Sequence, residues 1–430
     1  RRVQSVKVRV LDASVEFLDQ PFLKPLQLSS GLITQATEAR VAVTVRVDGR
    51  EGTGRGSIYL SDLWAWPGMS PDRAEKDRVL RALCTTLAGS LAAACGGEDE
   101  HPLELGLRLH HTISVPAYAP GIPLLARAVC GSPFDAAIHD AAGQVLGRSA
   151  FEFYGKSVAI PSADKWFPGK GAVAAIRETL REPVRELDAW WIVGAGDDLE
   201  GAVGPAVRER GMRCFKIKAL GRDNDADAAR VAEIYRAARG WGISPVLSVD
   251  SNEGNPDAAS VEEFLKILEA RDPEAYAALI YLEQPTTRDI TAFPQDWRTV
   301  SARKPVLLDE GLTQLELLPQ VCEQRWSGLA LKTCKGHSFT LVAAAWARSN
   351  GLALALQDLT NPGFAALHAY LLGARLSTLN GVELNSPQYT PAANVPWLPE
   401  MSGILEPRGG KHCLQRLDVP GLGSSLVHIP

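Results

Sequence analysis

The stretch that decides the fold is CFKIKAL, residues 214–220, a short and mostly apolar run that carries Lys216 and Lys218. Lysine is among the residues least often found in a protein interior. Residues two apart on a strand point to the same side, with backbones about 6–7 Å apart, so both lysines share one face while Ile217 points to the other. The alternative is an edge strand with two solvated lysines, which requires a sheet with a free edge.

This stretch belongs to a repeated pattern of apolar strand, loop and amphipathic helix. The expected strands are WWIVGAG (190–196), CFKIKAL (214–220), SPVLSVD (244–250), ALIYLE (278–283), PVLLDE (305–310), GLALK (328–332), LALALQD (352–358) and GVELN (381–385). Nearly continuous apolar strands alternating with helices predict a parallel sheet of the (β/α)8-barrel type. A doubly wound open sheet is the alternative, but its glycine-rich phosphate loop follows no early strand.

The first 150 residues have a different pattern. Residues 1–60 alternate apolar and polar positions and contain Asp48-Gly49, a pair typical of a tight turn between antiparallel strands. Residues 71–97 and 123–148 follow with helical patterns. Strands followed by helices predict a separate α+β unit.

Composition narrows the class of protein. The 430 residues are 46% hydrophobic and 22% charged, which is ordinary for a globular chain, and the net charge of −5 gives no nucleic-acid footprint. No apolar run approaches the ~20 residues of a membrane span. The seven scattered cysteines favour free thiols in a reducing compartment, and the strand-like start RRVQSVKVRV is unlike a signal sequence. We therefore expect a cytoplasmic protein, with its natural start upstream because the sequence does not begin with Met.

Five charged residues close successive predicted strands. They are separated by 23 to 33 residues, close to one βα unit, and are Lys218, Asp250, Glu283, Asp309 and Lys332. A single acid at a strand end is more often a helix cap, but in a barrel these five side chains converge on the C-terminal mouth, where catalytic groups lie. Crowded carboxylates repel one another unless a cation binds between them, and oxygen ligands suit Mg²⁺.

Taken in order, the motifs resemble those of the enolase superfamily, in its mandelate racemase and muconate lactonizing enzyme branch. The matching segments are KIK (216–218), DSN (250–252), LEQP (282–285), LLDEG (307–311) and LALK (329–332). SPFDAAIHDAAGQVLG (132–147) is similar to the last helix of that family's N-terminal capping domain.

The resemblance implies an α/β fold in which a modified TIM barrel of the (β/α)7β type follows an α+β capping domain. The capping domain would span residues 1–150 and the barrel residues 188–395. Residues 151–187 would connect the two, with no further role assigned, and residues 396–430 would return to the capping domain.

The resemblance also implies the cofactor and the site. Asp250, Glu283 and Asp309 would be ligands of Mg²⁺, for which Mn²⁺ can substitute. The family's shared chemistry is abstraction of a proton next to a substrate carboxylate, giving an enediolate that the metal stabilises. The implied partner is therefore a small-molecule carboxylate, and family habit implies a homo-oligomer that binds neither nucleic acid nor membrane.

Lys218 and Lys332 would be the acid/base groups on opposite faces of the substrate, with Lys216 beside the first. A base must be uncharged, and a neighbouring ammonium together with a nearby cation disfavours the charged form of lysine. Two opposed bases permit racemisation or epimerisation. With a leaving group beside the carbanion, the same site gives cycloisomerisation or elimination.

Departures from known branches leave three hypotheses. Gln357 and Lys332 stand where a mandelate-racemase-like member has a histidine base and its Asp partner, and Asn385-Ser386-Pro387 lacks the Asp-x-Asp pair of dipeptide epimerases. The leading hypothesis is a racemase, epimerase or cycloisomerase. An acid-sugar dehydratase or other lyase would need an acid, supplied by His337 or Asp358. A non-catalytic metal-binding barrel would not need to retain both lysines.

Capping-domain loops set specificity in this family, and by resemblance these are residues 21–31 and 54–68. The aromatic group Tyr59, Trp64 and Trp66 lies in the second loop and can line a substrate pocket, although such residues also anchor domain interfaces. The candidate substrate-binding residues are Tyr59, Trp64, Asn252, Asp358 and Glu383.

Other polar residues have simpler interpretations. Asp358 is equally suited to cap the helix after Asn361-Pro362, and Glu383 is equally suited to pair with a lysine. His337 and Lys335 lie in a KGHS loop and are interpreted as surface residues. His139, inside a helix, is interpreted as structural.

Overall fold

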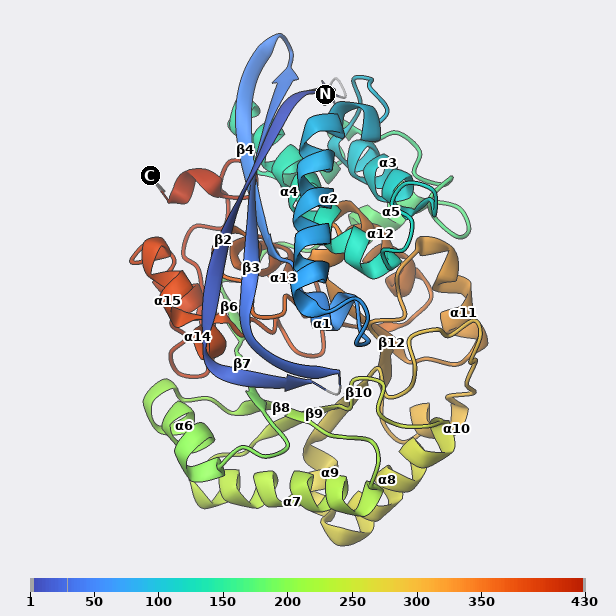
Figure 1. The fold of residues 1–430 in the computed structure, drawn as a ribbon, viewed down its shortest axis with the longest axis vertical. Coiled ribbons are helices and arrows are strands. Elements are labelled where there is room, and N and C mark those ends of the chain that lie inside the picture. Colours follow the sequence, from blue (N-terminus) through green and yellow to red (C-terminus); the bar gives the residue numbers. More distant parts are fainter. Residues whose placement is uncertain (1–3, 29, 428–430) are drawn as a thin grey trace.

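The computed structural model describes residues 4–28 and 30–427 and shows an N-terminal α+β part and a C-terminal barrel part (Figure 1). The N-terminal elements are β1 (Gln4–Ser5), β2 (Val8–Leu28), β3 (Gly31–Val47), β4 (Arg50–Tyr59), α1 (Asp62–Ala65), α2 (Arg73–Ala94), α3 (Pro102–Ser114) and α4 (Leu124–Leu146). Strands β2, β3 and β4 form an antiparallel sheet. Asp48 and Gly49 turn the chain with φ of 49° and 76°, values that Asp and Gly tolerate best. Both predicted helices are confirmed, and so are the predicted strands, apart from residues 1–3 and 29, which lie outside the described residues.

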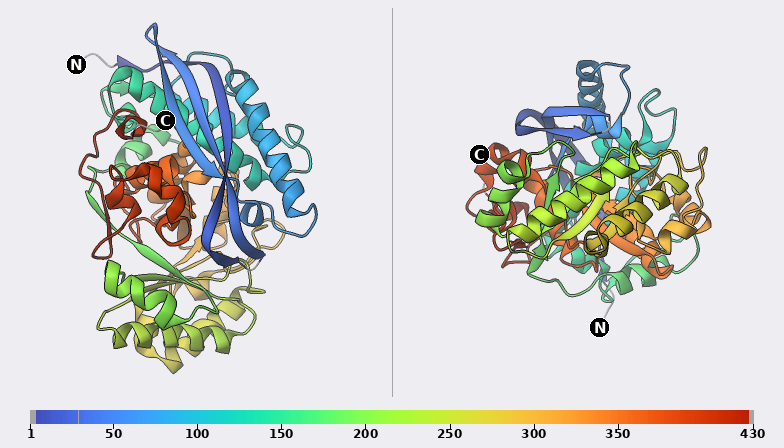
Figure 2. Two further views of the ribbon diagram at one scale, coloured as in Figure 1. Left: turned by 60° about the vertical axis from the view of Figure 1, so that its left-hand side comes forward. Right: turned by 90° about the horizontal axis from the view of Figure 1, so that it is seen from below.

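The hairpin formed by β2 and β3 is unusually long and bent. In Figure 1 and in the left view of Figure 2, its far end bends over the strands of the barrel. Leu26, Leu28 and Ile33 at this end line the same cavity as the barrel lysines. The N-terminal part therefore covers the mouth of the barrel.

Helix α4 packs directly on β4 because alternate residues of that strand are glycine. A Cβ atom on Gly54 would lie 2.1 Å from the backbone N of Ala141 and 2.2 Å from the backbone O of Ala137. A Cβ atom on Gly56 would lie 2.2 Å from the backbone O of Pro133. The glycine face of β4 thus lets the helix backbone touch the sheet.

We expect Gly54→Ala to lower the free energy of unfolding by about 3 kcal/mol, because the added methyl group meets rigid helix backbone and forces α4 away. Gly89→Ala is the matched control, since nothing lies within 4 Å of a Cβ at this exposed position of α2. It is expected to raise stability by about 0.5–1 kcal/mol through helix propensity. Urea unfolding of both variants measures the difference, and equal stabilities would contradict the close packing.

The barrel part contains seven parallel strands in the order β13-β12-β11-β10-β9-β8-β7. They are β7 (Trp190–Val193), β8 (Cys214–Lys218), β9 (Val246–Asp250), β10 (Leu279–Glu283), β11 (Val306–Leu308), β12 (Gly328–Lys332) and β13 (Ala353–Gln357). The helices between and after them are α6 (Gly204–Arg210), α7 (Asn224–Gly240), α8 (Ala258–Arg271), α9 (Pro273–Ala278), α10 (Arg298–Ser301), α11 (Leu318–Glu323), α12 (His337–Ser349), α13 (Gly363–Gly373), α14 (Ser386–Tyr389), α15 (Pro391–Asn394) and α16 (Ser402–Leu405). In Figure 1, α7, α8 and α9 lie outside β8 to β10. The chain is thus a modified TIM barrel preceded by an α+β part, as predicted.

The predicted eighth strand, GVELN at 381–385, is wrong as a full strand. It is reduced to one parallel bridge between Gln357 and Glu383. Side-chain amides complete the ring: the Gln388 Oε1 accepts from the Ile192 backbone N at 2.8 Å, and its Nε2 donates to the Ile192 O at 2.7 Å. Asn385 Nδ2 donates to the backbone O of Trp190 at 3.2 Å. Amide groups substitute for a ladder here because they carry one donor and one acceptor, as a peptide unit does.

The connecting segment forms small elements of its own: β5 (Val158–Ala159), α5 (Ala172–Thr179) and β6 (Glu186–Asp188). β5 pairs with β1, and β6 pairs with β14 (Lys411–Cys413) near the end of the chain. The C-terminal residues also reach α4, where Asp140 Oδ1 accepts from the Leu422 backbone N at 2.8 Å. No helix within the described ranges is both long and apolar enough to cross a membrane.

Inward-facing residues of the barrel form layers, which explains the lysines of β8. A lower layer is apolar and contains Trp190, Cys214, Tyr281, Leu307, Ala330 and Ala355. Two residues further along the strands, the same face carries Lys216, Glu283, Asp309, Lys332 and Gln357. Ile217 points outward and is 1% exposed in the surrounding core. Both lysines of CFKIKAL therefore lie inside the barrel, as predicted.

Candidate active site

A cavity of about 60 Å³ lies between the strand ends of the barrel and the far end of the β2–β3 hairpin. Its barrel side contains the five residues predicted at strand ends, Lys218, Asp250, Glu283, Asp309 and Lys332, together with Lys216. Its other side contains side chains from β2, β3 and α1. Five strands thus bring the predicted acid/base and carboxylate residues together in one place.

Lys218 and Lys216 contact different carboxylates although they are two residues apart. Lys218 Nζ donates to Asp250 Oδ2 at 2.6 Å and to Asn252 Oδ1 at 2.9 Å. Lys216 Nζ lies 3.0 Å from Glu283 Oε2 and donates to Glu383 Oε1 at 3.1 Å.

Lys332 lies across the cavity from Lys218, four strands away around the sheet. Its Nζ donates to Asp309 Oδ2 at 2.7 Å, to Glu283 Oε1 at 3.2 Å and to Gln357. Gln357 Nε2 in turn donates to Glu283 Oε2 at 2.6 Å. Glu283 is therefore the central acceptor of the site, shared by Lys216, Lys332 and Gln357.

The charges of the site shift one another's pKa values. Burial alone lowers the pKa of Lys216, but Glu283, Glu383 and Asp250 outweigh it and hold that pKa well above its usual range. The pKa of Lys332 is likewise raised, because Asp309 and Glu283 outweigh burial. Burial alone raises the pKa of Glu283, but the two lysines outweigh it and hold that pKa well below its usual range. These carboxylates favour the ammonium form of Lys332, so its use as a base requires that part of their charge be offset.

The three predicted metal ligands offer the right donors without being assembled around one point. Within the described part of the chain, no three Asp, Glu, His or Cys side chains stand together in a metal-binding arrangement, because ammonium groups lie between the carboxylates. Asp309 Oδ1 is buried and accepts no hydrogen bond, and all six carboxylate oxygens are hard donors. The residues therefore fit a divalent cation, provided that Lys216 and Lys332 move or lose a proton.

The predicted substrate-binding residues divide into two groups. Trp64, Asn252 and Glu383 line the cavity, and Trp64 Nε1 donates to Glu310 Oε1 at 2.9 Å. Tyr59 and Asp358 are buried but do not line it. The Tyr59 backbone N donates to Asn361 Oδ1, which ties β4 to the barrel. Asp358 accepts from Thr333 Oγ1 at 2.8 Å, and burial holds its pKa well above the usual range.

Two site residues escaped the sequence analysis. Lys335 is 2% exposed, not a surface residue, and its Nζ donates to the backbone O of Asp309. Glu310 follows Asp309 directly, and burial together with the Asp309 and Asp250 charges raises its pKa to about 8. Lys335 follows Lys332 by three residues, which is one turn of a short helix. This spacing could have indicated that the two lysines lie close to the same site.

His337 was also predicted to be a surface residue, and this is wrong. It is 1% exposed at the start of α12, its ring lies 4.6 Å from that of His139, and neither ring nitrogen has a hydrogen-bond partner. Burial, reinforced by His139, lowers the pKa of His337 to about 3. His139 is structural, as predicted: its Nε2 lies 2.8 Å from the Tyr154 hydroxyl.

We expect His337 to contribute to acid instability. Its pKa is lower in the folded state, so only the unfolded chain binds the proton between about pH 6 and pH 4, and folding stability falls as the pH falls through this window. His337→Phe should make the pH dependence shallower by about 1.4 kcal/mol per pH unit in that window. Urea unfolding at several pH values measures the slope. His111→Gln, at an exposed position, is the control, and an unchanged slope in His337→Phe would contradict the prediction.

Comparisons with known proteins agree with this geometry. The family model described as Enolase C-terminal domain-like matches residues 199–427, more than half of the chain. No curated protein sequence matches. Among solved structures, muconate lactonizing enzyme from Pseudomonas fluorescens complexed with muconolactone is similar at 20% identity and a TM-score of 0.65, covering 98% of this chain and 97% of that one.

Two further structures share the fold. An enolase from Bradyrhizobium complexed with magnesium and mandelic acid has 18% identity and a TM-score of 0.61, covering 97% of this chain and 95% of that one. The L-Ala-D/L-Glu epimerase from Bacillus subtilis has 16% identity and a TM-score of 0.64, covering 96% and 98%. The matched family model agrees with the barrel, with the hairpin that covers it and with these similar structures. The protein therefore belongs to the enolase superfamily, in the mandelate racemase and muconate lactonizing enzyme branch.

Proposed function

We propose that the protein abstracts a proton next to the carboxylate of a small substrate and returns it in a racemisation, epimerisation or cycloisomerisation. The observation that carries the proposal is the placement of Lys218 and Lys332 on opposite sides of one cavity. Asp250, Glu283 and Asp309 lie at the ends of the three strands between these two lysines. Lysine pairs of this kind can act on both faces of one carbon.

Different residues of the chain would carry out proton transfer, charge stabilisation and exclusion of water. Lys218 Nζ, held by Asp250 and Asn252, would take or give the proton on one face, and Lys332 Nζ, held by Asp309 and Glu283, on the other. Asp250, Glu283 and Asp309 would hold a Mg²⁺ ion, which would supply Lewis-acid stabilisation of negative charge on the substrate carboxylate. Trp64 and the hairpin side chains would exclude water from the cavity, which strengthens these electrostatic interactions.

Elimination of a hydroxyl group is less well supported. A lyase needs an acid beside the leaving group, and the two residues considered for that task, His337 and Asp358, do not line the cavity. The non-catalytic alternative is also weaker, since both lysines occupy the interior of the site.

Exchange of the α-proton in D₂O tests the proposal. The protein is incubated with Mg²⁺ and a panel of N-acyl amino acids, 2-hydroxy acids, dipeptides and acid sugars, and deuterium uptake is followed by mass spectrometry. We expect at least one class to exchange, and exchange should stop when EDTA removes the metal. Absence of exchange in every class, or exchange that EDTA leaves unchanged, would contradict the proposal.

Four companion properties belong to the same proposal. A cytoplasmic location is supported by the seven cysteines, all of which have free thiols. A homo-oligomer and Mn²⁺ as a substitute for Mg²⁺ are carried over from the family. The division into a capping domain, a connecting segment, a barrel and a C-terminal segment is supported by the separate sheets of the two parts.

A further inference from the structure

The cavity has a charged side and an apolar side. All of its charged side chains come from the barrel. On the hairpin side the lining residues are Leu26, Leu28, Ile33, Ser61 and Trp64, while the apolar Ile192 and Leu359 and the polar Thr360 line the cavity from the barrel part. The Ser61 hydroxyl donates to the backbone O of Tyr59 and the Trp64 indole N–H donates to Glu310, so both donors are already engaged. A substrate carboxylate held at the lysines would therefore place the rest of the molecule against an apolar wall.

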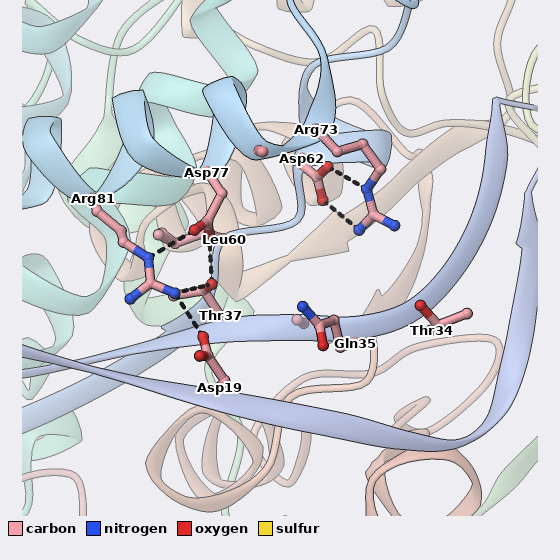
Figure 3. A pocket seen from close by; sticks show the side chains of 11 residues that line it. Asp19, Thr34, Gln35, Thr37, Leu60, Asp62, Arg73, Asp77 and Arg81 are labelled. Carbon is pink, nitrogen blue, oxygen red and sulfur yellow. Dashed lines mark hydrogen bonds and ion pairs between the residues drawn. The ribbon is translucent and has the colours of Figure 1, made fainter.

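Charged residues of the hairpin and of the helices beside it pair outside this cavity. A separate pocket of about 450 Å³, between the hairpin and α2, contains Asp19 of the hairpin together with charged side chains of α1 and α2 (Figure 3). There Arg81 Nε donates to Asp77 Oδ2 at 2.7 Å and its NH2 to Asp19 Oδ1 at 2.6 Å. Arg73 Nε donates to Asp62 Oδ2 at 2.7 Å. These groups are already paired, so none of them is available to a charged substituent in the active-site cavity.

Three buried acceptor atoms of the residues that line the cavity accept no hydrogen bond, namely Asp309 Oδ1, Glu383 Oε2 and Asn385 Oδ1, and of these only the amide oxygen of Asn385 is uncharged. Asn385 lines the cavity and is 1% exposed, and its Oδ1 accepts no hydrogen bond. Its Nδ2 is engaged by the backbone O of Trp190, which fixes the orientation of the amide. A buried acceptor left unpaired is costly, so the site is suited to a ligand with one uncharged donor, an N–H or O–H group.

Resting on the proposed function, we infer that the substrate is a monocarboxylate with a single uncharged hydrogen-bond donor and an apolar branched or aromatic substituent. Dicarboxylates and ammonium-bearing dipeptides are disfavoured, because a second charge would lie unpaired against Leu26, Leu28 and Ile33. Polyhydroxylated acids are disfavoured because the same side chains leave their hydroxyl groups without partners. The cavity of about 60 Å³ is small beside ligand pockets of about 300–1,000 Å³, so we expect Leu26, Leu28 and Ile33 to shift when such a substrate binds.

Two measurements on the full chain test the inference. The first compares α-proton exchange of N-acetylleucine, N-acetylphenylalanine and mandelate with that of N-acetylglutamate, N-acetyllysine and gluconate. The second compares binding of the α-methyl analogues of the acetylated amino acids, which have no proton to lose, by calorimetry. We expect kcat/KM and affinity to favour the apolar members by at least about 100-fold.

A variant pair sharpens the result. Leu28→Arg adds a cation to the apolar wall and should raise affinity for the glutamate analogue by about 10-fold or more while lowering that for the leucine analogue. Leu23→Arg is the matched control, because Leu23 lies on the same strand but is 73% exposed and outside the cavity lining. It should leave the preference unchanged.

The outcomes separate the two proposals. Equal binding of apolar and charged analogues would overturn the inference even if exchange occurs. A clear binding preference without exchange in any compound would support the inference and overturn the proposed function.

Discussion

Lys218→Ala and Lys332→Ala should each lower α-proton exchange by about 10³-fold, but for opposite enantiomers of one substrate. A positioned general base contributes about 10²–10⁴-fold to such a reaction. Because the two ammonium groups lie on β8 and β12, on opposite sides of the cavity, each lysine can reach only one face of the α-carbon. Exchange of each enantiomer is measured separately in D₂O by mass spectrometry, with wild-type protein alongside.

Lys266→Ala provides the matched control, since its side chain is 55% exposed on the surface, where it pairs with Glu262. Lys266→Ala should catalyse α-proton exchange of both enantiomers at the wild-type rate. Wild-type exchange in both active-site variants would show that neither lysine is the base. If each variant lost α-proton exchange of both enantiomers, the two lysines would act as one unit.

Glu283→Gln should lower the free energy of unfolding by about 3–5 kcal/mol at neutral pH and also abolish exchange. Glu283 accepts from both Lys216 and Lys332, so its neutralisation leaves two buried ammonium groups short of a partner. The pKa of Glu283 is lower in the folded state than in the unfolded chain. The carboxylate therefore makes its full contribution to folding stability above the ordinary pKa of a glutamate, and this contribution is lost as the pH falls through the pKa of the folded state. The destabilisation should therefore shrink in strong acid.

Urea unfolding of metal-free protein at pH 7 and at about pH 2 measures this effect apart from catalysis. Glu51→Gln, which removes an exposed carboxylate paired with Arg46, should unfold like the wild type. If Glu283→Gln were as stable as the wild type at pH 7, the central place of Glu283 in the charge network would be wrong.

The sequence was informative wherever local pattern and chemistry agree. An apolar run that ends in one charged residue specifies both a buried parallel strand and a side chain at its C-terminal end, so seven strands and the lysine and carboxylate residues could be predicted. The alternation of CFKIKAL was enough to place Lys216 and Lys218 on the interior face.

The errors concern contacts between distant segments. GVELN has the composition of a strand, but the amides of Asn385 and Gln388 take over the pairing that a full eighth strand would make. The KGHS loop has a surface composition, but Gly336 and His337 are covered by α4, to which Asp135 belongs. The local sequence does not indicate that a distant helix will bury these residues. Tyr59 was placed near the substrate by analogy of loops, and its role in joining β4 to the barrel required the contact with Asn361.

The amides that complete the barrel have a dynamic consequence. A continuous ladder opens only when several backbone hydrogen bonds break together, whereas the pairing at Ile192 depends on the rotamer of one glutamine. Rotation of that side chain releases a donor and an acceptor of β7 at once without unfolding any strand. We therefore expect the pairing at Ile192 to open more readily than the ladders of the seven strands, and Ile192 also lines the active-site cavity.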